Sequence, residues 1–501
     1  MHQRRLPPFP DLCSFLSFLE DRGGLRTVAA PVSMRLELTE LHRKVIAAGG
    51  PALRLSQARG ATDAASNLPV IANLFGTPER VAWGLGTDLD GLQSLGSLLA
   101  WMRAPQPPRS LGEVRRLWPA ARTALQARPR IVGGPREWCD GAADFSQLPV
   151  QTCWPGDAGP LITWPLVITR PPGPDDPAAY NVGVYRMQVI ERDRTIMRWL
   201  PMRGGAAHHR LWQAEKTEMP VAVVIGADPA LLLAAVMPAP EGVSELALAG
   251  IVSGRRVGLA PCREIALHAP ASAEIVLEGT VSVTETALEG PFGDHTGYYN
   301  APAHYPVFTL KAMRVREGAH YLTTFTGRAP DEPSVIGAAL LDVFKPLLRQ
   351  QLPEIVDVWL PPEACSYRIA VIAIAKSYAG QARRVMMGFW SLLPQFSMTK
   401  MLMVVDDDID IRSWPDVMWA LATRMDPSRD LLVAERTPID QLDFASPLEG
   451  LGGKLGIDAT CKIGAETSRD WSETIVMDPA IEKQVVRRWQ EFFPETTCAS
   501  V

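Results

Sequence analysis

The chain has 501 residues, of which 47% are hydrophobic and 21% are charged. These proportions are those of a globular protein and exclude a disordered, collagenous or coiled-coil chain. The 50 Lys and Arg residues against 55 Asp and Glu residues give a net charge of −5, so no basic excess points to nucleic-acid binding. No signal peptide and no uninterrupted apolar stretch of about 20 residues is evident, so we expect a soluble protein, at most peripheral to a membrane.

The seven cysteines are widely spaced, and none forms a CxxC pair. An odd number of scattered cysteines favours a reducing compartment and argues against a structural zinc ion. We therefore expect a cytoplasmic location.

The N-terminal part predicts a small α/β unit. Asp11 is expected to cap a helix whose apolar residues follow helical spacing and which ends at Gly23. A second helix is predicted over Thr39–Ala48 and a short strand over Val70–Ala72. Proline-rich residues 105–108 mark a surface connection.

Strand-like stretches dominate from about Ile131 to Leu322 and predict a β-barrel-like middle domain. The predicted strands are Leu161–Thr169, Val182–Ile190, Thr195–Leu200, Val221–Ile225, Glu274–Val283 and Val307–Val315. The polar residues 191–194 indicate a hairpin turn, and one helix is predicted over Pro229–Val236 behind Asp228 as its cap.

After about Arg328, strands alternate with helices, which is typical of a parallel sheet. The expected elements are strands Ile369–Ala375, Met401–Val405 and Leu431–Ala434, and helices Arg383–Leu392 and Trp414–Arg424. Residues 479–493 predict an amphipathic helix with Ile481, Val485, Trp489 and Phe492 on one stripe. Such a stripe must dock on its own body or on a neighbouring subunit.

The most informative stretch runs from Glu289 to Tyr299 and contains three glycines, two carboxylates and a histidine. Two carboxylates in one site drive their pKa values apart, so one of them can act as a general acid. A solvated turn, with Asp294 bonded to its own backbone, explains the same residues. The sequence by itself leaves both interpretations open.

A second candidate stretch opens the predicted hairpin with Asn181 and Arg186. An amide oxygen and a guanidinium suit a metal ion or a phosphate. In an ideal strand these two side chains point to opposite faces, so they converge only if Gly183 bulges the strand or Asn181 lies before it. An edge-strand arginine facing water is the simpler interpretation of Arg186. Arg198 and the Gly-rich bend after Arg203 could add a phosphate cradle, although this signal is unspecific.

Other polar groups carry less information. Asp406, Asp407 and Asp408 follow a strand and could bind Mg²⁺, but acids in this position more often cap helices or form a solvated turn. Glu245 is predicted to be helical, and such residues mostly face solvent. His208 and His209 point about 100° apart on a helix and rarely share one ion. The motifs of metalloproteases, P-loop proteins, α/β-hydrolases and dinucleotide-binding folds are missing.

An ordered set of motifs spans nearly the whole chain. It comprises PVIANLFGTPERV (69–81), QTCWPGDAGPLITW (151–164), NVGVYR (181–186), IMRWLPMRGG (196–205), ASAEIVLEG (271–279), EGPFGDHTGYY (289–299), TGRAPDEP (326–333), RVMMGFW (384–390), TRMDP (423–427) and LDFASP (442–447). In these motifs the chain resembles the UbiD family of prenylated-flavin-dependent decarboxylases. It looks closest to the branch that decarboxylates 4-hydroxy-3-polyprenylbenzoate in ubiquinone biosynthesis.

The resemblance implies an α/β (α+β) multidomain fold. We expect an N-terminal α/β domain over residues 1–127, a flavin-reductase-like split β-barrel over residues 128–325, and a C-terminal α/β domain with a terminal amphipathic helix over residues 326–501. Family members form homodimers or hexamers, so a homo-oligomer is implied, to which the amphipathic tail is a sensible contributor.

The resemblance also implies prenylated FMN as cofactor, supplied by a separate flavin prenyltransferase, with Mn²⁺ at its phosphate and K⁺ nearby. Asn181 and Glu245 match the metal ligands, and Met202 stands where a close relative has a histidine. The matching flavin contacts are Val184, Tyr185, Arg186, Arg198, Trp199, Leu200, Arg203, Gly204 and, for the phosphate, Lys400.

The implied catalytic residues are Arg186, Glu289 and Asp294, with Asp294 as proton donor to the product carbon and Glu289 relaying or tuning that proton. The implied substrate is an aromatic carboxylic acid with a polyprenyl chain. Two alternatives remain: a decarboxylase or carboxylase of a small aromatic or α,β-unsaturated acid, and a flavin-binding barrel without decarboxylase activity. The combination of Arg186 with two acids weighs against the second.

Overall fold

The N-terminal part of the chain forms a small sheet covered by helices, as its alternating pattern predicts. This computed structural model describes residues 4–60, 66–103, 110–237, 243–392 and 394–493. The sheet has the order β1-β3-β5-β18 and consists of β1 (Leu25–Val28), β3 (Ala52–Leu55), β5 (Val70–Ala72) and β18 (Tyr321–Leu322). Its last strand lies 249 residues after β5 in sequence and pairs with it in parallel.

Helices surround this sheet, and two short strands, β2 (Val32–Ser33) and β4 (Ala58–Arg59), pair with each other in a separate parallel sheet. The helices are α1 (Leu12–Glu20), α2 (Glu37–Ala47), α3 (Pro78–Gly84), α4 (Leu89–Arg103) and α5 (Leu111–Ala124). The predicted cap at Asp11 is confirmed, because its carboxylate accepts from the Ser14 amide at 2.8 Å. Helix α2 begins at Glu37, two residues before the predicted start. Leu36 precedes it and provides no side-chain cap that would have marked this start in the sequence. The predicted connection at 105–108 lies outside the described residues.

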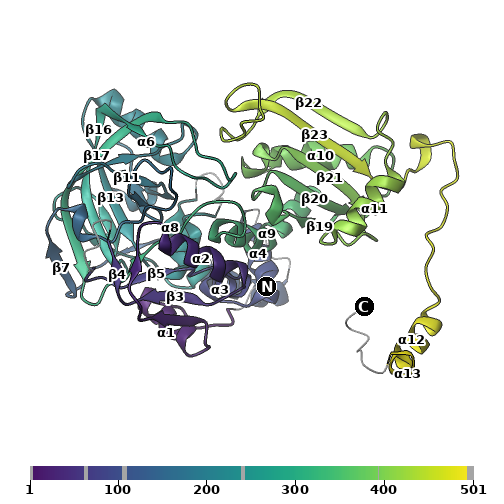
Figure 1. The fold of residues 1–501 in the computed structure, drawn as a ribbon, viewed down its shortest axis with the longest axis horizontal. Helices are drawn as coiled ribbons and strands as arrows, with labels where there is room; N and C mark the ends of the chain where they lie inside the picture. Colours follow the sequence, from purple (N-terminus) through teal and green to yellow (C-terminus); the bar gives the residue numbers. More distant parts are fainter. Residues whose placement is uncertain (1–3, 61–65, 104–109, 238–242, 393, 494–501) are drawn as a thin grey trace.

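The central part forms a nine-stranded antiparallel sheet with the order β10-β9-β13-β16-β17-β12-β11-β8, and β7 also pairs with β17. The strands are β7 (Trp138–Gly141), β8 (Leu161–Ile162), β9 (Leu166–Thr169), β10 (Asn181–Val184), β11 (Met187–Val189), β12 (Arg194–Met197), β13 (Met219–Ile225), β16 (Ile275–Glu289) and β17 (Ala303–Arg316). Strands β10 and β11 lie near opposite ends of this order, yet only Tyr185 and Arg186 separate them in sequence. The sheet must therefore curl until its ends approach each other, as Figure 1 shows.

Two predicted strands are wrong in their continuity. The predicted strand Val182–Ile190 is divided into β10 and β11, and Leu161–Thr169 is divided into β8 and β9. The predicted hairpin is confirmed, because β11 and β12 pair around residues 190–193. The division after Val184 has a functional consequence, since Arg186 leaves the ladder at the seam where the curled sheet nearly closes.

Helices and a smaller sheet flank the curled sheet. They are α6 (Gly204–Glu215), α7 (Pro229–Ala234), α8 (Glu245–Ser253), β6 (Arg130–Ile131), β14 (Gly258–Pro261) and β15 (His268–Pro270). Helix α7 has the predicted cap, because Asp228 accepts from the Leu231 amide. Glu245 is helical, as predicted, and is the first residue of α8. Its carboxylate accepts from the Val182 amide near the start of β10, whereas the sequence favoured a side chain that faces water.

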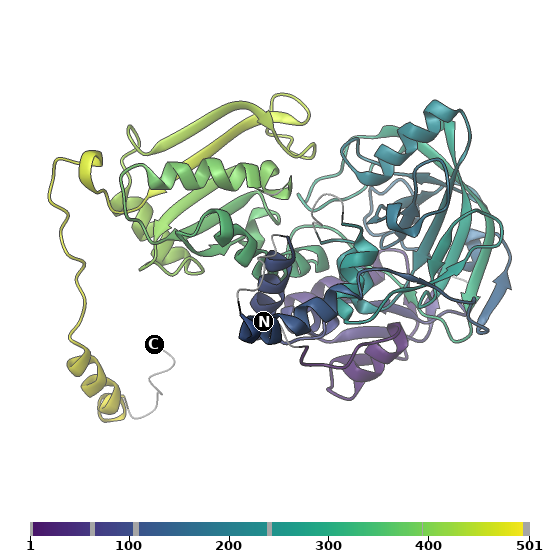
Figure 2. The same cartoon turned by 180° about the vertical axis from the view of Figure 1, so that it is seen from behind.

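The C-terminal sheet is mixed, which corrects the prediction of a parallel sheet. Its order is β19-β20-β21-β23-β22, and both edge strands run antiparallel to their neighbours. The elements are α9 (Glu332–Gln351), β19 (Ile355–Trp359), β20 (Ile369–Ile374), α10 (Gln381–Leu392), β21 (Met401–Asp406), α11 (Trp414–Arg424), β22 (Leu431–Pro438) and β23 (Leu451–Ala459). Helix α9 packs on α4 and α3 and leads to β19, so it joins the two lobes of Figures 1 and 2.

The C-terminal tail stands away from both lobes. The predicted single helix is two, α12 (Pro479–Arg487) and α13 (Trp489–Phe492), with the break at Arg488. Their apolar side chains are exposed, for example Ile481 at 48% and Phe492 at 47%. Docking on the chain's own body is therefore wrong, as Figures 1 and 2 show, and a neighbouring subunit remains the alternative.

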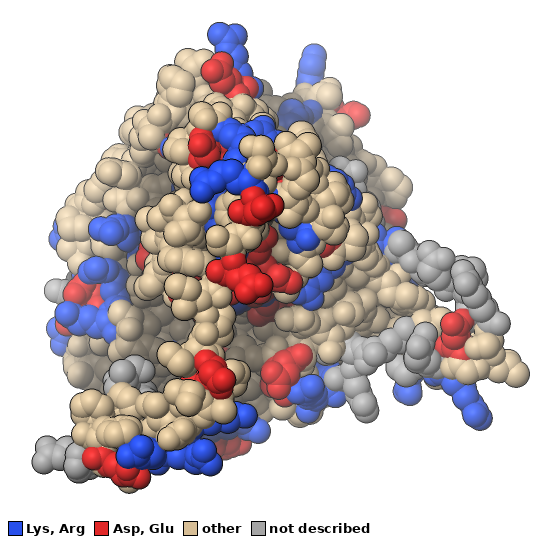
Figure 3. All heavy atoms as spheres, turned by 90° about the vertical axis from the view of Figure 1, so that its right-hand side faces the viewer, with Lys and Arg blue, Asp and Glu red and all other residues tan. Residues whose placement is uncertain are grey.

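The surface is consistent with the nearly balanced charge of the sequence. On the face shown in Figure 3, basic and acidic side chains lie in small mixed groups separated by other residues. No helix in the described part of the chain is both long and apolar enough to cross a membrane.

Candidate functional site

Arg186, at the seam of the curled sheet, is the centre of a buried polar cluster. Its Nε donates to Glu289 Oε1 at 2.8 Å, Nη1 to Asp294 Oδ2 at 2.9 Å, and Nη2 to Asn300 Oδ1 at 2.8 Å. Arg198, from the end of β12, adds a second cation 3.7 Å from Asp294 and 3.9 Å from Glu289. The Glu289 side chain is fully buried. The structure therefore brings together Arg186 and the two carboxylates, the three residues that the resemblance implies to be catalytic.

The loop between β16 and β17 places Asp294 in this cluster. Gly293 packs so closely on Trp154 that a Cβ there would lie 2.2 Å from the indole ring. Asp157 fixes both segments, because one carboxylate oxygen accepts from the Gly293 amide and the other from the Trp154 amide. The loop is thus held by a second motif from far away in the sequence, and this explains why a glycine-rich stretch adopts one conformation.

His295 extends the cluster toward the C-terminal lobe. Its Nδ1 lies 3.0 Å from Asp294 Oδ1, and its Nε2 lies 3.3 Å from Asp440 Oδ2. Burial opposes the charged imidazolium, but the two carboxylates outweigh it and raise the pKa of His295 to about 9. Burial also opposes the charged form of Asp294, but His295 and Arg186 outweigh it and lower the pKa of Asp294 to about 2. At neutral pH the proton of this pair therefore resides on His295.

This charge distribution predicts a pH dependence of stability. Because the pKa of His295 is raised, its ion pairs stabilise the folded state fully below the unfolded-state pKa of about 6.5. That contribution is lost as the pH rises through about 9. We expect the difference in unfolding free energy between wild type and His295→Gln, measured with urea, to shrink from pH 6.5 to pH 9. A difference that stays constant over this range would contradict the imidazolium.

Asn181 and Glu245 lie together at the start of β10. Glu245 Oε2 accepts from the Val182 amide at 3.0 Å, and burial raises the pKa of Glu245. A Cβ on Gly204, the first residue of α6, would lie 1.9 Å from Asn181 Oδ1, so a larger residue would require the Asn181 side chain to move. Oxygen donors beside the N-terminus of a 12-residue helix suit a hard divalent ion that bridges to a phosphate. The residues therefore fit the metal and the flavin phosphate.

The remaining predicted flavin contacts are divided between this region and the C-terminal lobe. The Tyr185 hydroxyl accepts from the Gly205 amide and from Asn181, and Trp199 packs edge-on against Tyr185. Val184 and Leu200 are half-buried, and Arg203, before α6, is exposed. Lys400 lies in the C-terminal lobe, where its ammonium group is 2.9 Å from Asp443. The structure thus does not place Lys400 with the other candidates.

Sequence reasoning missed several members of the cluster. Asn300, which bonds Arg186, directly follows the recognised motif. Asp440 and Tyr367 come from the C-terminal lobe, and the Tyr367 hydroxyl donates to Asp440 at 2.8 Å. No local pattern could connect them to His295, although the motif at 442–447 begins two residues after Asp440.

The weaker candidates contact other side chains and backbone groups, and Asp406 and Asp408 form ion pairs that no interpretation of the sequence included. Asp406 and Asp408 both bind the guanidinium of Arg424. His208 contacts Thr169, whereas His209 contacts the Ser282 carbonyl, so the two rings serve different partners.

Three domain models of one family match consecutive parts of the chain. They are described as the N-terminal domain, the Rift-related domain and the C-terminal domain of UbiD, a 3-octaprenyl-4-hydroxybenzoate carboxy-lyase. The matched residues are 16–99, 136–329 and 334–459, respectively.

Solved structures resemble the chain over nearly its full length. The UbiD-class enzyme HmfF from Pelotomaculum thermopropionicum, in complex with FMN, is 28% identical with a TM-score of 0.76, covering 94% of this chain and 98% of that one. An evolved dimeric form of the same enzyme, with prFMN, matches with equal identity and TM-score over 95% and 98%. Vanillic acid decarboxylase from Sedimentibacter hydroxybenzoicus, in closed form, is 25% identical with a TM-score of 0.78 over 97% and 98%.

Proposed function

The chain belongs to the UbiD family of carboxy-lyases, and from this membership we propose that it decarboxylates an aromatic carboxylic acid with prenylated FMN. The observation that carries the proposal is the buried cluster in which Arg186 bonds Glu289, Asp294 and Asn300. HmfF, which is similar over nearly the whole chain, binds FMN and prFMN.

Arg186 is suited to hold the substrate carboxylate. A guanidinium has five N–H donors in a planar fork, and three of them are engaged by the three neighbours. Two N–H groups remain for a carboxylate, and Arg198 adds a second positive charge nearby. The neighbours fix the orientation of the fork before the substrate arrives, so little orientation has to be gained on binding.

Loss of CO₂ leaves a carbon that must receive a proton. Asp294 is ionised at neutral pH, so it has to obtain that proton first. His295 Nδ1 is 3.0 Å from Asp294 and provides the source. We assign Asp294 as the group that delivers the proton to carbon, His295 as the group that reloads it, and Glu289 as the second acid that holds Arg186 and tunes the transfer.

The prenylated flavin, when bound, supplies the electrophile that accepts the bonding electrons of the departing carboxylate. Its contacts are proposed to be Val184, Tyr185, Arg186, Arg198, Trp199, Leu200, Arg203 and Gly204. Asn181 and Glu245 would hold the Mn²⁺ ion that accompanies the cofactor, and K⁺ is the proposed second cation. A flavin prenyltransferase supplies the cofactor, and Lys400 reaches the phosphate only if the two lobes approach each other.

Removing either metal ligand is expected to weaken metal retention. Asn181→Ala and Glu245→Ala each delete one oxygen donor from a hard ion. We expect the metal content per chain after gel filtration to fall in both variants. Glu215→Ala, at the exposed far end of α6, is the control and should keep the wild-type content. Unchanged occupancy in both ligand variants would refute the assignment.

The finer proposal is that the substrate is 4-hydroxy-3-polyprenylbenzoate, converted to 2-polyprenylphenol in ubiquinone biosynthesis. The description of the matched family models, which names an octaprenyl-hydroxybenzoate, supports it. A small aromatic acid is the second candidate, because the similar enzyme from Sedimentibacter hydroxybenzoicus is a vanillic acid decarboxylase.

One experiment tests both levels of this proposal. The protein is produced with and without a flavin prenyltransferase, and release of ¹³CO₂ is measured from carboxyl-labelled 4-hydroxybenzoate with and without a polyprenyl chain. We expect folded but inactive protein without the prenyltransferase, and turnover of the polyprenylated acid with it. Turnover of the unprenylated acid alone would favour the second candidate, and equal activity without the prenyltransferase would refute the cofactor.

We also propose that the chain forms a homo-oligomer, either a dimer or a hexamer. Its support is the tail, whose residues Ile481, Val485 and Phe492 are at least 40% exposed on helices that touch neither lobe. Burial of such apolar surface stabilises by about 25 cal/mol per Å², which favours covering it with a second copy.

A further inference from the structure

Three side chains that can bind a metal converge at the junction of the N-terminal and central sheets. Cys13 lies in the first turn of α1, Glu274 directly precedes β16, and His320 directly precedes β18. Cys13 Sγ is 3.8 Å from His320 Nδ1 and 4.0 Å from Glu274 Oε2, and that Nδ1 is 3.5 Å from Oε2. The candidate active-site cluster uses none of these residues.

The three separations are close to those of ligands on one tetrahedral ion. Zinc bonds of about 2.3 Å to sulfur and about 2.0–2.2 Å to nitrogen and oxygen place such ligand atoms about 3.4–3.6 Å apart. The observed nitrogen–oxygen distance of 3.5 Å is within this range. The two distances to sulfur exceed it by only a few tenths of an ångström, which a small rotation of the Cys13 side chain removes.

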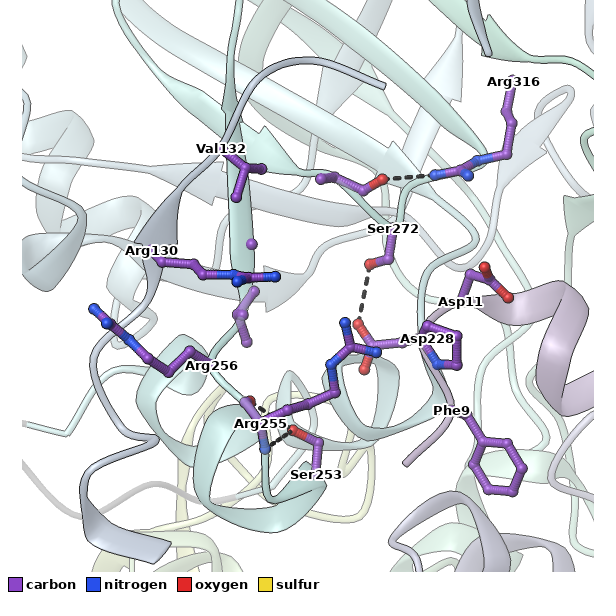
Figure 4. A pocket seen from close by; sticks show the side chains of 14 residues that line it. Phe9, Asp11, Arg130, Val132, Asp228, Ser253, Arg255, Arg256, Ser272 and Arg316 are labelled. Carbon is purple, nitrogen blue, oxygen red and sulfur yellow. Dashed lines mark hydrogen bonds between the residues drawn. The ribbon is translucent and has the colours of Figure 1, made fainter. Parts of the chain in front are cut away.

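The Glu274 side chain is fully buried, and its two oxygens face different neighbours. Oε2, which faces Cys13 and His320, also accepts from the His320 amide at 2.9 Å. Oε1 lies on the side of Arg316 and has no hydrogen-bond partner among the described residues. The nearest guanidinium, Arg316, is 3.9 Å away and is committed to the carbonyls of Ala271 and Ala273. Figure 4 shows Arg316 on the wall of an adjoining cavity, with one of these two hydrogen bonds drawn as a dashed line. Arg316 thus contacts Glu274 only at 3.9 Å, and a buried carboxylate is costly unless a positive charge approaches it more closely.

We propose that Cys13, Glu274 and His320 form a zinc site with a thiolate, a carboxylate and an imidazole ligand, and with water in the fourth position. This donor set suits Zn²⁺, which accepts sulfur, nitrogen and oxygen ligands together. The ion would connect the first helix to the start of β16 and to the segment that enters β18. The sequence argued against structural zinc because its cysteines are odd in number, widely spaced and without a CxxC pair. The other two ligands lie 261 and 307 residues after Cys13.

The test uses the full-length protein, stripped with a chelator and then given Zn²⁺ or Co²⁺ alone. We expect one bound ion per chain beyond any ion held by Asn181 and Glu245, and a thiolate-to-cobalt charge-transfer band in the near ultraviolet. Cys13→Ser and His320→Gln should each lose the band and this ion, whereas Cys139→Ser, an exposed cysteine on β7, should keep both. Zn²⁺ should also raise the unfolding midpoint of the stripped wild type but not of the two ligand variants.

The cobalt band separates this site from the proposed catalytic metal. Glu245→Ala should retain the band, because its site contains no sulfur. Absence of the band in wild type, or equal Zn²⁺ content in wild type, Cys13→Ser and His320→Gln, would overturn the proposal. If Cys13→Ser fails to fold, the metal content and the cobalt band of His320→Gln test the proposal. The His320 side chain is 14% exposed, so its replacement is expected to be tolerated.

Discussion

Asp294→Asn is expected to lower turnover by about 10²–10⁴-fold, which is the usual contribution of a general acid. Asparagine keeps the size of the side chain and can still accept from Arg186, but it cannot carry a proton from His295 to carbon. Cofactor and metal content should remain normal, because their proposed ligands lie on β10 and α8. The measurement is kcat of cofactor-loaded protein.

Two further variants, Asp440→Asn and His295→Gln, distinguish delivery of the proton to carbon by Asp294 from the supply of that proton by His295. Asp440→Asn removes one carboxylate that holds the proton on His295, so the high-pH limb of the kcat profile should move to lower pH. His295→Gln should remove that limb while a slower reaction persists, because water can reload Asp294. Near-wild-type turnover of Asp294→Asn, with full cofactor loading, would instead leave Asp294 a turn residue and make Glu289 the acid.

Arg186→Met is expected to abolish decarboxylation and to reduce the free energy of unfolding by about 3–5 kcal/mol. The substitution removes the binding group for the substrate carboxylate. It also leaves the fully buried Glu289 without its closest cation, since Arg198 is 3.9 Å away. Urea unfolding at pH 7 measures the loss of stability, and ¹³CO₂ release measures the loss of activity.

A double variant identifies the cause of that instability. Arg186→Met combined with Glu289→Gln removes both charges, so it should be more stable than Arg186→Met alone, while remaining inactive. If the double variant is the less stable of the two, lost packing around Phe292, whose ring lies 5.1 Å from the guanidinium, would explain the effect instead.

The sequence predicts local structure well where the signal is local. The cap at Asp11, the proline-started helix α7 and the whole of α11 are confirmed because capping residues and helical spacing mark their ends. The division of the predicted strand after Val184 could not be foreseen. It arises because β10 and β11 pair with opposite ends of one curled sheet, which is a property of the whole topology.

The candidate site divides in the same way. Glu289, Asp294 and His295 stand in one motif, so their proximity is evident from the sequence. Their charge states are not evident from the sequence, because the low pKa of Asp294 depends on His295 and on Arg186, which lies 108 residues earlier. Asp440, which helps to keep His295 protonated, belongs to a different lobe.

The position of β18 has a consequence for synthesis of the chain. The N-terminal sheet receives its edge strand from Tyr321–Leu322, after the entire central sheet has been traversed. During translation one edge of β5 pairs with β3, but its other edge lacks a partner until residue 322 has left the ribosome. The exposed edge of β5, which is fully buried in the finished fold, is then available for wrong pairing. Ribosome-bound chains that end before residue 321 should accordingly be more sensitive to protease around Val70–Ala72 than chains released beyond it.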